Sequence, residues 1–172
     1  RQVKSWRSFG DQYETFQEEI SDILTSLSQI GVNVYIGDEK YFAFLTRGLY
    51  SVKGNDMFLN ERYLSQPNVM LKVLRHEGWH IAQDCMAGTI DNTFTGVILQ
   101  DGVVPDWIAN GAEKTYPDRA VPYEAEAMYA AFSDTMTRDA LKVCAGPKKM
   151  WEVYKPTPLT KKWLLEQGFI AK

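Results

Sequence analysis

The chain has 172 residues, of which 45% are hydrophobic and 24% are charged, a composition typical of a globular protein with one domain and a sizeable core. The net charge of -3 and the lack of a basic stripe argue against nucleic acid as a partner. No apolar run approaches the roughly 20 residues that a membrane-spanning helix needs, so we expect a soluble protein with no membrane insertion.

The chain begins at Arg1 rather than at methionine, as expected either of a mature form whose signal peptide was removed or of a chain cut at a chosen point. Cys85 and Cys144 could form one disulfide in an oxidising compartment, or remain two buried thiols in the cytosol. A secreted or periplasmic location is favoured over a cytoplasmic one. The oligomeric state cannot be read from the sequence.

The first sixty or so residues predict a helix followed by a small sheet. Between Phe9 and Ile30 apolar residues recur every three or four positions, which indicates an amphipathic N-terminal helix within residues 1–31 that ends at Gly31. Residues 32–63 are expected to form the sheet. The alternation in VNVYIGD indicates its first strand, and the turn-forming KGND indicates a hairpin. The apolar residues that flank this turn are Tyr50, Val52, Met57 and Leu59.

The rest of the chain predicts two longer helices separated by an irregular stretch. Helical spacing of apolar residues returns over residues 67–87. Residues 88–121 are expected to form a loop or lid with one short helix near PDWIANGAEK. Pro122 and Gly146 bound a helix over residues 122–145, and residues 146–172 supply C-terminal packing segments. We expect a single α+β domain in which long helices pack on a small mixed or antiparallel sheet.

The two histidines of the chain, His76 and His80, stand four residues apart in HEGWH, inside the helix predicted over residues 67–87. Residues four apart share one helix face with Cα atoms roughly 6 Å apart, so both imidazoles can bind one ion at about 2.0–2.1 Å, which suits Zn²⁺. Glu77 is offset from that face, where its carboxylate can take a proton from a water on the metal. The alternative is an unrelated pair of histidines on one helix.

A catalytic zinc site needs a third protein ligand. Asp84 lies about 12 Å along the helix from His76, too far to share the ion, so we expect it to orient an imidazole or to form the polar end of the helix. Without a third histidine, the ligand is a carboxylate or, as a second choice, Cys144. Glu124 and Glu126 in YEAEA are the candidates, and since residues two apart point about 200° apart on a helix, one of them faces the metal.

HEGWH followed by a helix that carries EAEA resembles the gluzincin type of zinc metallopeptidase, in which a glutamate on a later helix is the third ligand. The longer HExxHxxGxxH pattern is excluded, because Gln83 and Met86 stand at its glycine and last histidine. The resemblance implies a zincin-like fold with HExxH on the central active-site helix. It selects Glu124 as the ligand, with Glu126 as the alternative. Met128 stands where related peptidases have an aspartate.

The resemblance also implies that an edge strand ahead of the HExxH helix runs along the substrate. NDMFLNE occupies that place in the order of elements, although an ordinary hairpin strand in the core is an equal alternative. In the stretch after the HExxH helix, Trp107 could line the cleft, but we expect it to anchor the short helix on the core.

The expected function is hydrolysis of a peptide bond in a peptide or protein substrate, with His76, His80 and Glu124 on Zn²⁺ and Glu77 as the general base. Tyr123 is a candidate donor to the developing oxyanion. Further candidates for that role are Tyr116, Tyr129 and Arg119. The alternatives are a non-catalytic metal-binding or protein-interaction module on a zincin scaffold, and a structural protein that binds no metal.

Overall fold

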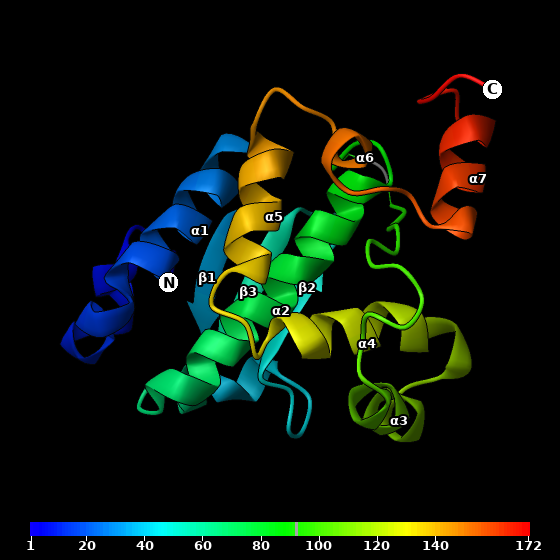
Figure 1. The fold of residues 1–172 in the computed structure, drawn as a ribbon. Coiled ribbons are helices and arrows are strands. Elements are labelled where there is room, and N and C mark those ends of the chain that lie inside the picture. The colour runs from blue at the N-terminus through cyan, green and yellow to red at the C-terminus, as the bar shows by residue number, and fades with distance from the viewer. Residues whose placement is uncertain (92) are drawn as a thin grey trace.

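The computed structural model describes residues 1–91 and 93–172, which form an α+β structure with a three-stranded mixed sheet (Figure 1). The strands are β1 (Asn33–Gly37), β2 (Gly48–Ser51) and β3 (Asp56–Asn60). Their order is β1-β3-β2, with β1 parallel and β2 antiparallel to β3. The predicted hairpin is confirmed, because Tyr50 lies opposite Met57 in the register of β2 and β3 and both side chains face the core.

The described residues contain the helices α1 (Gln17–Gln29), α2 (Pro67–Met86), α3 (Asp106–Thr115), α4 (Val121–Ala130), α5 (Met136–Ala145), α6 (Met150–Val153) and α7 (Pro158–Glu166). Short 3-10 turns occupy Trp6–Phe9, Asp11–Phe16, Glu39–Tyr41, Glu61–Tyr63 and Asp118–Ala120. Within residues 1–91 and 93–172, no helix combines the length and the hydropathy that crossing a bilayer requires.

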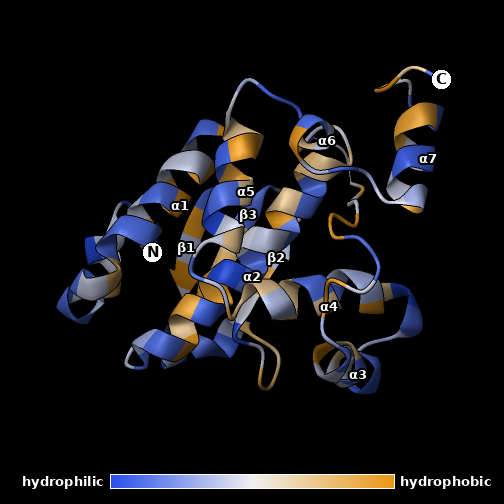
Figure 2. Cartoon of the chain, in the orientation of Figure 1, coloured by the Kyte–Doolittle hydropathy of each residue, from blue (hydrophilic) through white to orange (hydrophobic). Residues whose placement is uncertain are grey.

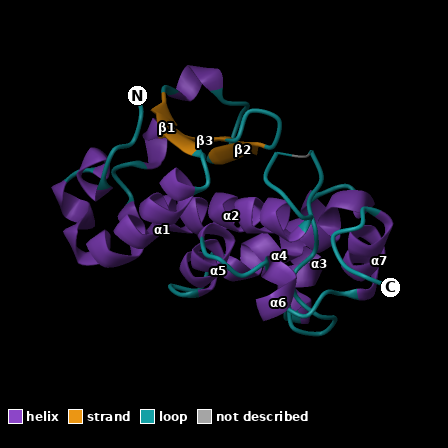
Figure 3. Cartoon of the chain, turned by 90° about the horizontal axis from the view of Figure 1, so that it is seen from above, coloured by secondary structure: helices purple, strands orange, loops and turns teal. Residues whose placement is uncertain are grey.

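Helix α2 runs through the middle of the molecule (Figure 3). The sheet covers one side of α2, while α4 and α5 pack on other sides of it, and α1 packs against α5. Figure 2 shows that apolar and polar residues alternate around α1, α2 and α5. Their apolar faces form the core, in which Ile23, Met57, Leu74 and Leu141 are fully buried. The helix that carries both histidines is therefore held from several sides.

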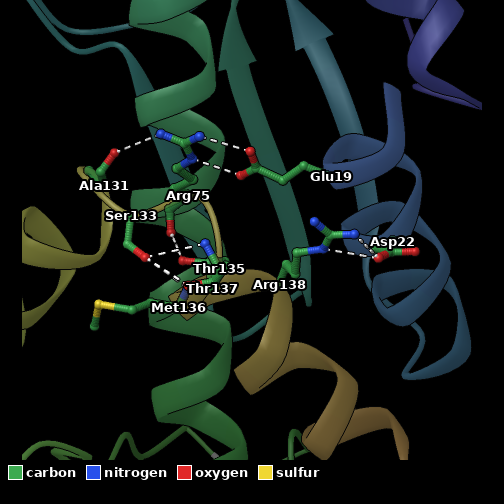
Figure 4. A network of polar contacts seen from close by, with 9 residues as sticks. All are labelled: Glu19, Asp22, Arg75, Ala131, Ser133, Thr135, Met136, Thr137 and Arg138. Carbon is green, nitrogen blue, oxygen red and sulfur yellow. Dashed lines mark hydrogen bonds and ion pairs between the residues drawn. The ribbon is translucent and has the colours of Figure 1, made fainter. Parts of the chain in front are cut away.

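Two helix predictions are wrong in extent. The N-terminal helix spans Gln17–Gln29 and not residues 1–31, because the chain before it forms 3-10 turns. The helix predicted over residues 122–145 is two helices, α4 and α5. Between them, the Ser133 hydroxyl oxygen accepts hydrogen bonds from the backbone N–H groups of Thr135 and Met136, at 3.2 and 3.1 Å (Figure 4). Thr135 is the N-cap of α5, and the Ser133 side chain satisfies the first helical N–H group, that of Met136, so α5 can start anew in a direction of its own.

Of the two equal alternatives for NDMFLNE, the hairpin strand in the core is confirmed and the edge strand is wrong. This segment contains β3, which is the central strand because β1 pairs with the side of it that faces away from its hairpin partner. Met57 and Leu59 of β3 are fully buried. The outer strand beside α2 is β2, so any strand addition along the cleft would use β2.

A disulfide joins Cys85, near the end of α2, to Cys144 in α5, with their Cα atoms 5.9 Å apart. The bond ties the C-terminal ends of two core helices together. It also removes Cys144 from the possible metal ligands, because its sulfur is already bonded.

Candidate metal centre

Helices α2 and α4 bring three potential metal ligands together. His76 and His80 lie one turn apart on α2, and Glu124 lies in the first turn of α4. The Glu124 carboxylate places Oε2 3.0 Å from His76 Nε2 and Oε1 3.1 Å from His80 Nε2, while the two Nε2 atoms are 3.3 Å apart. All three side chains are partly buried. The predicted trio thus meets at one point.

The spacing of these donor atoms suits a tetrahedral ion. Two ligands that bind zinc at 2.0–2.1 Å with tetrahedral angles are separated by roughly 3.3 Å. The two Nε2 atoms, 3.3 Å apart, match this value, and each of them lies 3.0–3.1 Å from a different oxygen of the Glu124 carboxylate. His76, His80 and Glu124 could therefore hold one metal ion, since each offers one ligand atom within 4.8 Å of the others.

Glu77 lies beneath the outer strand of the sheet and lines the same cavity as the three potential ligands. Its side chain is buried, and the Tyr50 backbone N–H donates a hydrogen bond to it. Strand β2 comes this close because Gly48 has no side chain. A Cβ at that position would lie 2.5 Å from Val73 Cγ1 and 3.2 Å from Glu77 Cγ. The strand thus covers the predicted base and shields it from bulk solvent.

The two residues between Glu77 and His80 serve the packing of the helix. Gly78 lets α5 approach α2, since an added Cβ would lie 2.6 Å from Thr137 Cγ2. Trp79 is 1% exposed, and its indole N–H donates to Glu126 Oε1 at 3.1 Å. The HEGWH motif therefore turns its histidines and Glu77 toward the cavity and its other two residues toward α5 and α4.

Glu126, the alternative third ligand, points away from the histidines and is 2% exposed. Besides the Trp79 bond, it accepts hydrogen bonds from Gln83 Nε2 at 2.9 Å and from the backbone N–H groups of Ile98 and Leu99, at 3.0 and 2.6 Å. Each of these contacts comes from an N–H donor. Glu126 therefore ties α2 and the segment around residue 98 to α4, and Glu124 is the glutamate of the pair that lies beside the histidines.

The pKa values of the two glutamates at the site are shifted in opposite directions. Burial raises the pKa of Glu77, and the nearby His76 and His80 partly offset this rise. Burial also acts to raise the pKa of Glu124, but hydrogen bonds with both histidines outweigh it and hold this pKa well below its usual value. For His80, burial acts to lower the pKa, and the bond to Glu124 raises it above the ordinary value. Glu124 thus stays anionic while Glu77 is biased toward proton uptake.

The site opens into a cavity of about 900 Å³. One wall is the outer strand β2 with Arg47 and Leu49, and the opposite wall comes from α4 with Met128 and Phe132 beyond it. Met128, at the position where the resembled family has an aspartate, lines this wall. The cavity is large enough for part of an extended peptide chain, since ligand pockets typically span about 300–1,000 Å³.

Of the candidate oxyanion donors, Tyr116 and Tyr123 line the cavity. The Tyr116 hydroxyl lies near the potential ligands, since the Glu124 carboxylate acts on its pKa. Burial, followed by the charges of Glu124 and Glu77, raises the pKa of Tyr116 to about 12. Tyr129 and Arg119 are outside the set of described residues that line the cavity.

Trp107 is 66% exposed and packs against Phe132, with ring centroids 5.6 Å apart and ring planes tilted by 59°. The expectation that it anchors α3 on the core is therefore wrong. Its ring instead extends the apolar rim of the cavity beyond Phe132.

Asp84 contacts neither imidazole. Its Oδ2 accepts a hydrogen bond from the Tyr50 hydroxyl at 2.7 Å, and the residue that touches His80 is Gln83, with Oε1 2.8 Å from His80 Nδ1. Of the two predicted roles of Asp84, orienting an imidazole is wrong, because its side chain faces β2, and what remains is a polar residue near the end of α2.

No protein-family model, no curated protein and no solved structure matches this chain. A fold does not identify a reaction by itself, so the function is inferred from the chemistry of the site.

Three residues at the site were missed in the sequence, namely Gly48, Tyr50 and Gln83. Gln83 stands three residues after His80 and so shares its helix face, a spacing that could have indicated the contact. Gly48 and Tyr50 act through the crossing of β2 over α2, for which a single sequence carries no signal.

Proposed function

We propose that this protein is a zinc-dependent peptidase of the gluzincin type that hydrolyses a peptide bond in its cavity. The observation that carries the proposal is the convergence of His76, His80 and Glu124 with ligand-like spacing on a cavity that Glu77 also lines. Such a set offers three protein ligands, leaves a side open, and places a carboxylate base beside it, as a catalytic zinc site requires.

The arrangement of elements supports a zincin-like fold. The helix with the histidines lies against a small mixed sheet, the outer strand of that sheet borders the cavity, and the third potential ligand comes from a later helix. We infer that an extended peptide lies along β2 and adds to its outer edge by main-chain hydrogen bonds.

When bound, zinc supplies a Lewis acid that polarises the scissile carbonyl and makes water a nucleophile near neutral pH. Glu77 accepts the proton that the attacking water loses and delivers it to the nitrogen of the leaving amine. Its buried position beneath β2 favours both steps, because a raised pKa brings a carboxylate closer to the pH at which it both takes and gives a proton. The pKa of Glu124 is instead lowered, which suits a ligand that stays anionic.

Tyr116 is the stronger candidate for a donor to the developing oxyanion. Its hydroxyl lies near Glu124 and it lines the cavity, and its pKa of about 12 keeps it protonated at neutral pH. A protonated phenol there can donate to an oxygen that gains negative charge. Tyr123 lines the cavity as well and is the second candidate.

The metal site is tested with two matched variants, Glu124→Gln and Glu126→Gln, which carry the same change two residues apart. After incubation with zinc and desalting, elemental analysis should find about one zinc per chain in the wild type and in Glu126→Gln, and almost none in Glu124→Gln. A wild type that retains no zinc would refute the proposal.

The reaction is tested with the zinc-loaded wild type on a library of fluorogenic peptides. Glu77→Gln should keep its zinc and lose about 100-fold or more of the turnover, since a positioned general base contributes roughly 10²–10⁴-fold. Bound zinc without turnover of any peptide would instead favour a non-catalytic metal-binding module.

A further inference from the structure

The side chain of Gln83 fills the space between His80 and α4 and is fully buried. Its oxygen Oε1 lies 2.8 Å from Nδ1 of His80, the ring nitrogen that faces away from His76 and Glu124. A buried amide at this distance can meet the imidazole in two ways, with either its oxygen or its nitrogen toward the ring. The orientation of the amide decides whether Nδ1 of His80 carries a hydrogen.

The neighbours of Gln83 Nε2 select one orientation. This nitrogen lies 3.1 Å from the backbone oxygen of Tyr123 and 2.9 Å from Glu126 Oε1. A carbonyl oxygen can only accept a hydrogen bond, and every contact of Glu126 described above comes from a donor. The NH₂ group of Gln83 must therefore face α4, which leaves its oxygen facing His80. An oxygen there requires that Nδ1 carries the hydrogen.

With Nδ1 bonded to Gln83, Nε2 is the ring nitrogen that faces the potential ligand set, where it can donate to Glu124 without an ion and must lose that hydrogen to act as a ligand. Nε2 of His80 is the atom that lies 3.1 Å from Glu124 Oε1 and 3.3 Å from His76 Nε2. Imidazoles that bind metals commonly donate their second N–H to a neighbouring oxygen, which fixes both the tautomer and the ring orientation.

We propose that Gln83 is a positioning residue that keeps a hydrogen on Nδ1 of His80 and aims Nε2 at the metal centre, and that α4 fixes Gln83 in turn through Tyr123 and Glu126. The metal part of this inference rests on the proposed function. The hydrogen bond itself does not, since it joins two side chains of this chain.

The histidine content of the chain makes this bond directly observable. With ¹⁵N-labelled histidine, NMR signals come from His76 and His80 alone, and a His76→Gln variant assigns them. In the metal-free wild type we expect a slowly exchanging proton on Nδ1 of His80. Gln83→Met keeps the length of the side chain and removes the acceptor, so this proton should exchange too fast to be seen. The zinc dissociation constant should rise by about 10- to 100-fold.

Two further variants separate positioning from stability. Thr137→Val removes a buried hydrogen bond from the opposite side of α2, where the Thr137 hydroxyl donates to the Arg75 carbonyl at 2.7 Å. It should destabilise the fold and leave both the Nδ1 proton and the zinc affinity unchanged. Gln83→Glu restores an acceptor for His80 but brings a carboxylate against the Tyr123 carbonyl. It should be less stable than Gln83→Met and yet bind zinc more tightly.

The proposal is overturned if the metal-free wild type shows no protected proton on Nδ1 of His80, if Gln83→Met keeps that proton, or if the zinc dissociation constant of Gln83→Met stays within twofold of the wild type. The wild-type spectrum decides the first point even if a variant does not fold. A wild type that binds no zinc but shows the protected proton would refute the proposed function and the metal role of Gln83. If Thr137→Val also binds zinc weakly, the weaker zinc binding of Gln83→Met reflects only a loss of stability.

Discussion

At the scale of single residues, the side chain of Asp84 is the least satisfied buried group among the described residues. It is fully buried, and while Oδ2 accepts the hydrogen bond of Tyr50, its Oδ1 has no hydrogen-bond partner in residues 1–91 and 93–172. Burial raises the pKa of Asp84 to about 7; the bond from Tyr50 opposes this rise, and the charge of Asp91 adds to it. Folding therefore disfavours the ionised form of this carboxyl group.

The burial of Asp84 predicts that the free energy of unfolding depends on pH. Because the pKa of Asp84 is higher in the folded than in the unfolded chain, its contribution to stability is full below about pH 4 and is lost as the pH rises through about 7. Asp84→Asn keeps an acceptor for Tyr50 and cannot ionise. Its free energy of unfolding in urea should match that of the wild type near pH 4 and exceed it by about 1–3 kcal/mol at pH 8. A variant less stable than the wild type at pH 8 would contradict this account.

At the scale of elements, the contact between α2 and α5 depends on the small residue inside the histidine motif. Gly78 faces Thr137 and Leu141 of α5, and a Cβ there would lie 2.6 Å from Thr137 Cγ2 and 3.4 Å from Leu141 Cδ1. Helices that approach this closely leave no room for a methyl group. The position between Glu77 and Trp79 is thus occupied by glycine for packing.

Two glycine substitutions test this packing. Gly78→Ala should lower the free energy of unfolding by about 1–3 kcal/mol, since overpacking outweighs the gain in helix propensity. Gly111→Ala in α3 is the control, because its added Cβ would meet only Met128 Cε, at 3.7 Å. It should be neutral or stabilising by up to about 1 kcal/mol. Equal effects of the two changes in chemical denaturation would show that α5 does not press on α2 at Gly78.

At the scale of the whole molecule, an ion pair next to the site joins three helices. Arg75, which precedes His76, donates to both carboxylate oxygens of Glu19 in α1 at 2.7 and 2.8 Å, and to the Ala131 carbonyl after α4 at 3.2 Å (Figure 4). A second pair, Arg138 with Asp22, links α5 to α1 at 2.6 Å but is more exposed (Figure 4). Together they hold α1 against the helices that build the site.

The two pairs should differ in their contribution to stability. Arg75 and Glu19 are 11% and 8% exposed, so Arg75→Met leaves a buried carboxylate without its cation and should cost about 3–5 kcal/mol. Arg138→Met makes the same change opposite Asp22, which is 31% exposed, and should cost at most about 1 kcal/mol. The double change Arg75→Met with Glu19→Leu should recover part of the larger loss. Thermal unfolding at pH 7 compares the wild type, the two single variants and the double variant. An equal loss of stability in both single variants would contradict the larger contribution of the buried pair.

Several features of the fold and the site were predictable because they depend on neighbouring residues. The hairpin follows from alternation on either side of KGND, and the face shared by His76 and His80 follows from the geometry of one helix turn. The break between α4 and α5 was not predicted, because the apolar periodicity continues across it and the competing bonds come from one serine side chain. The oxyanion donor was not resolved either, since three tyrosines and one arginine all offer a donor and only the fold separates them.

The sequence by itself determined that two imidazoles and a carboxylate share one region of a helix, since that requires only the regular rise and rotation of the backbone. Only the tertiary structure decided that Glu124 and not Glu126 meets them, and that β2 and not β3 borders the cavity. In each case the alternatives are equal in local chemistry. The choice depends on how separate elements pack, and the burial of apolar faces around α2 sets that packing.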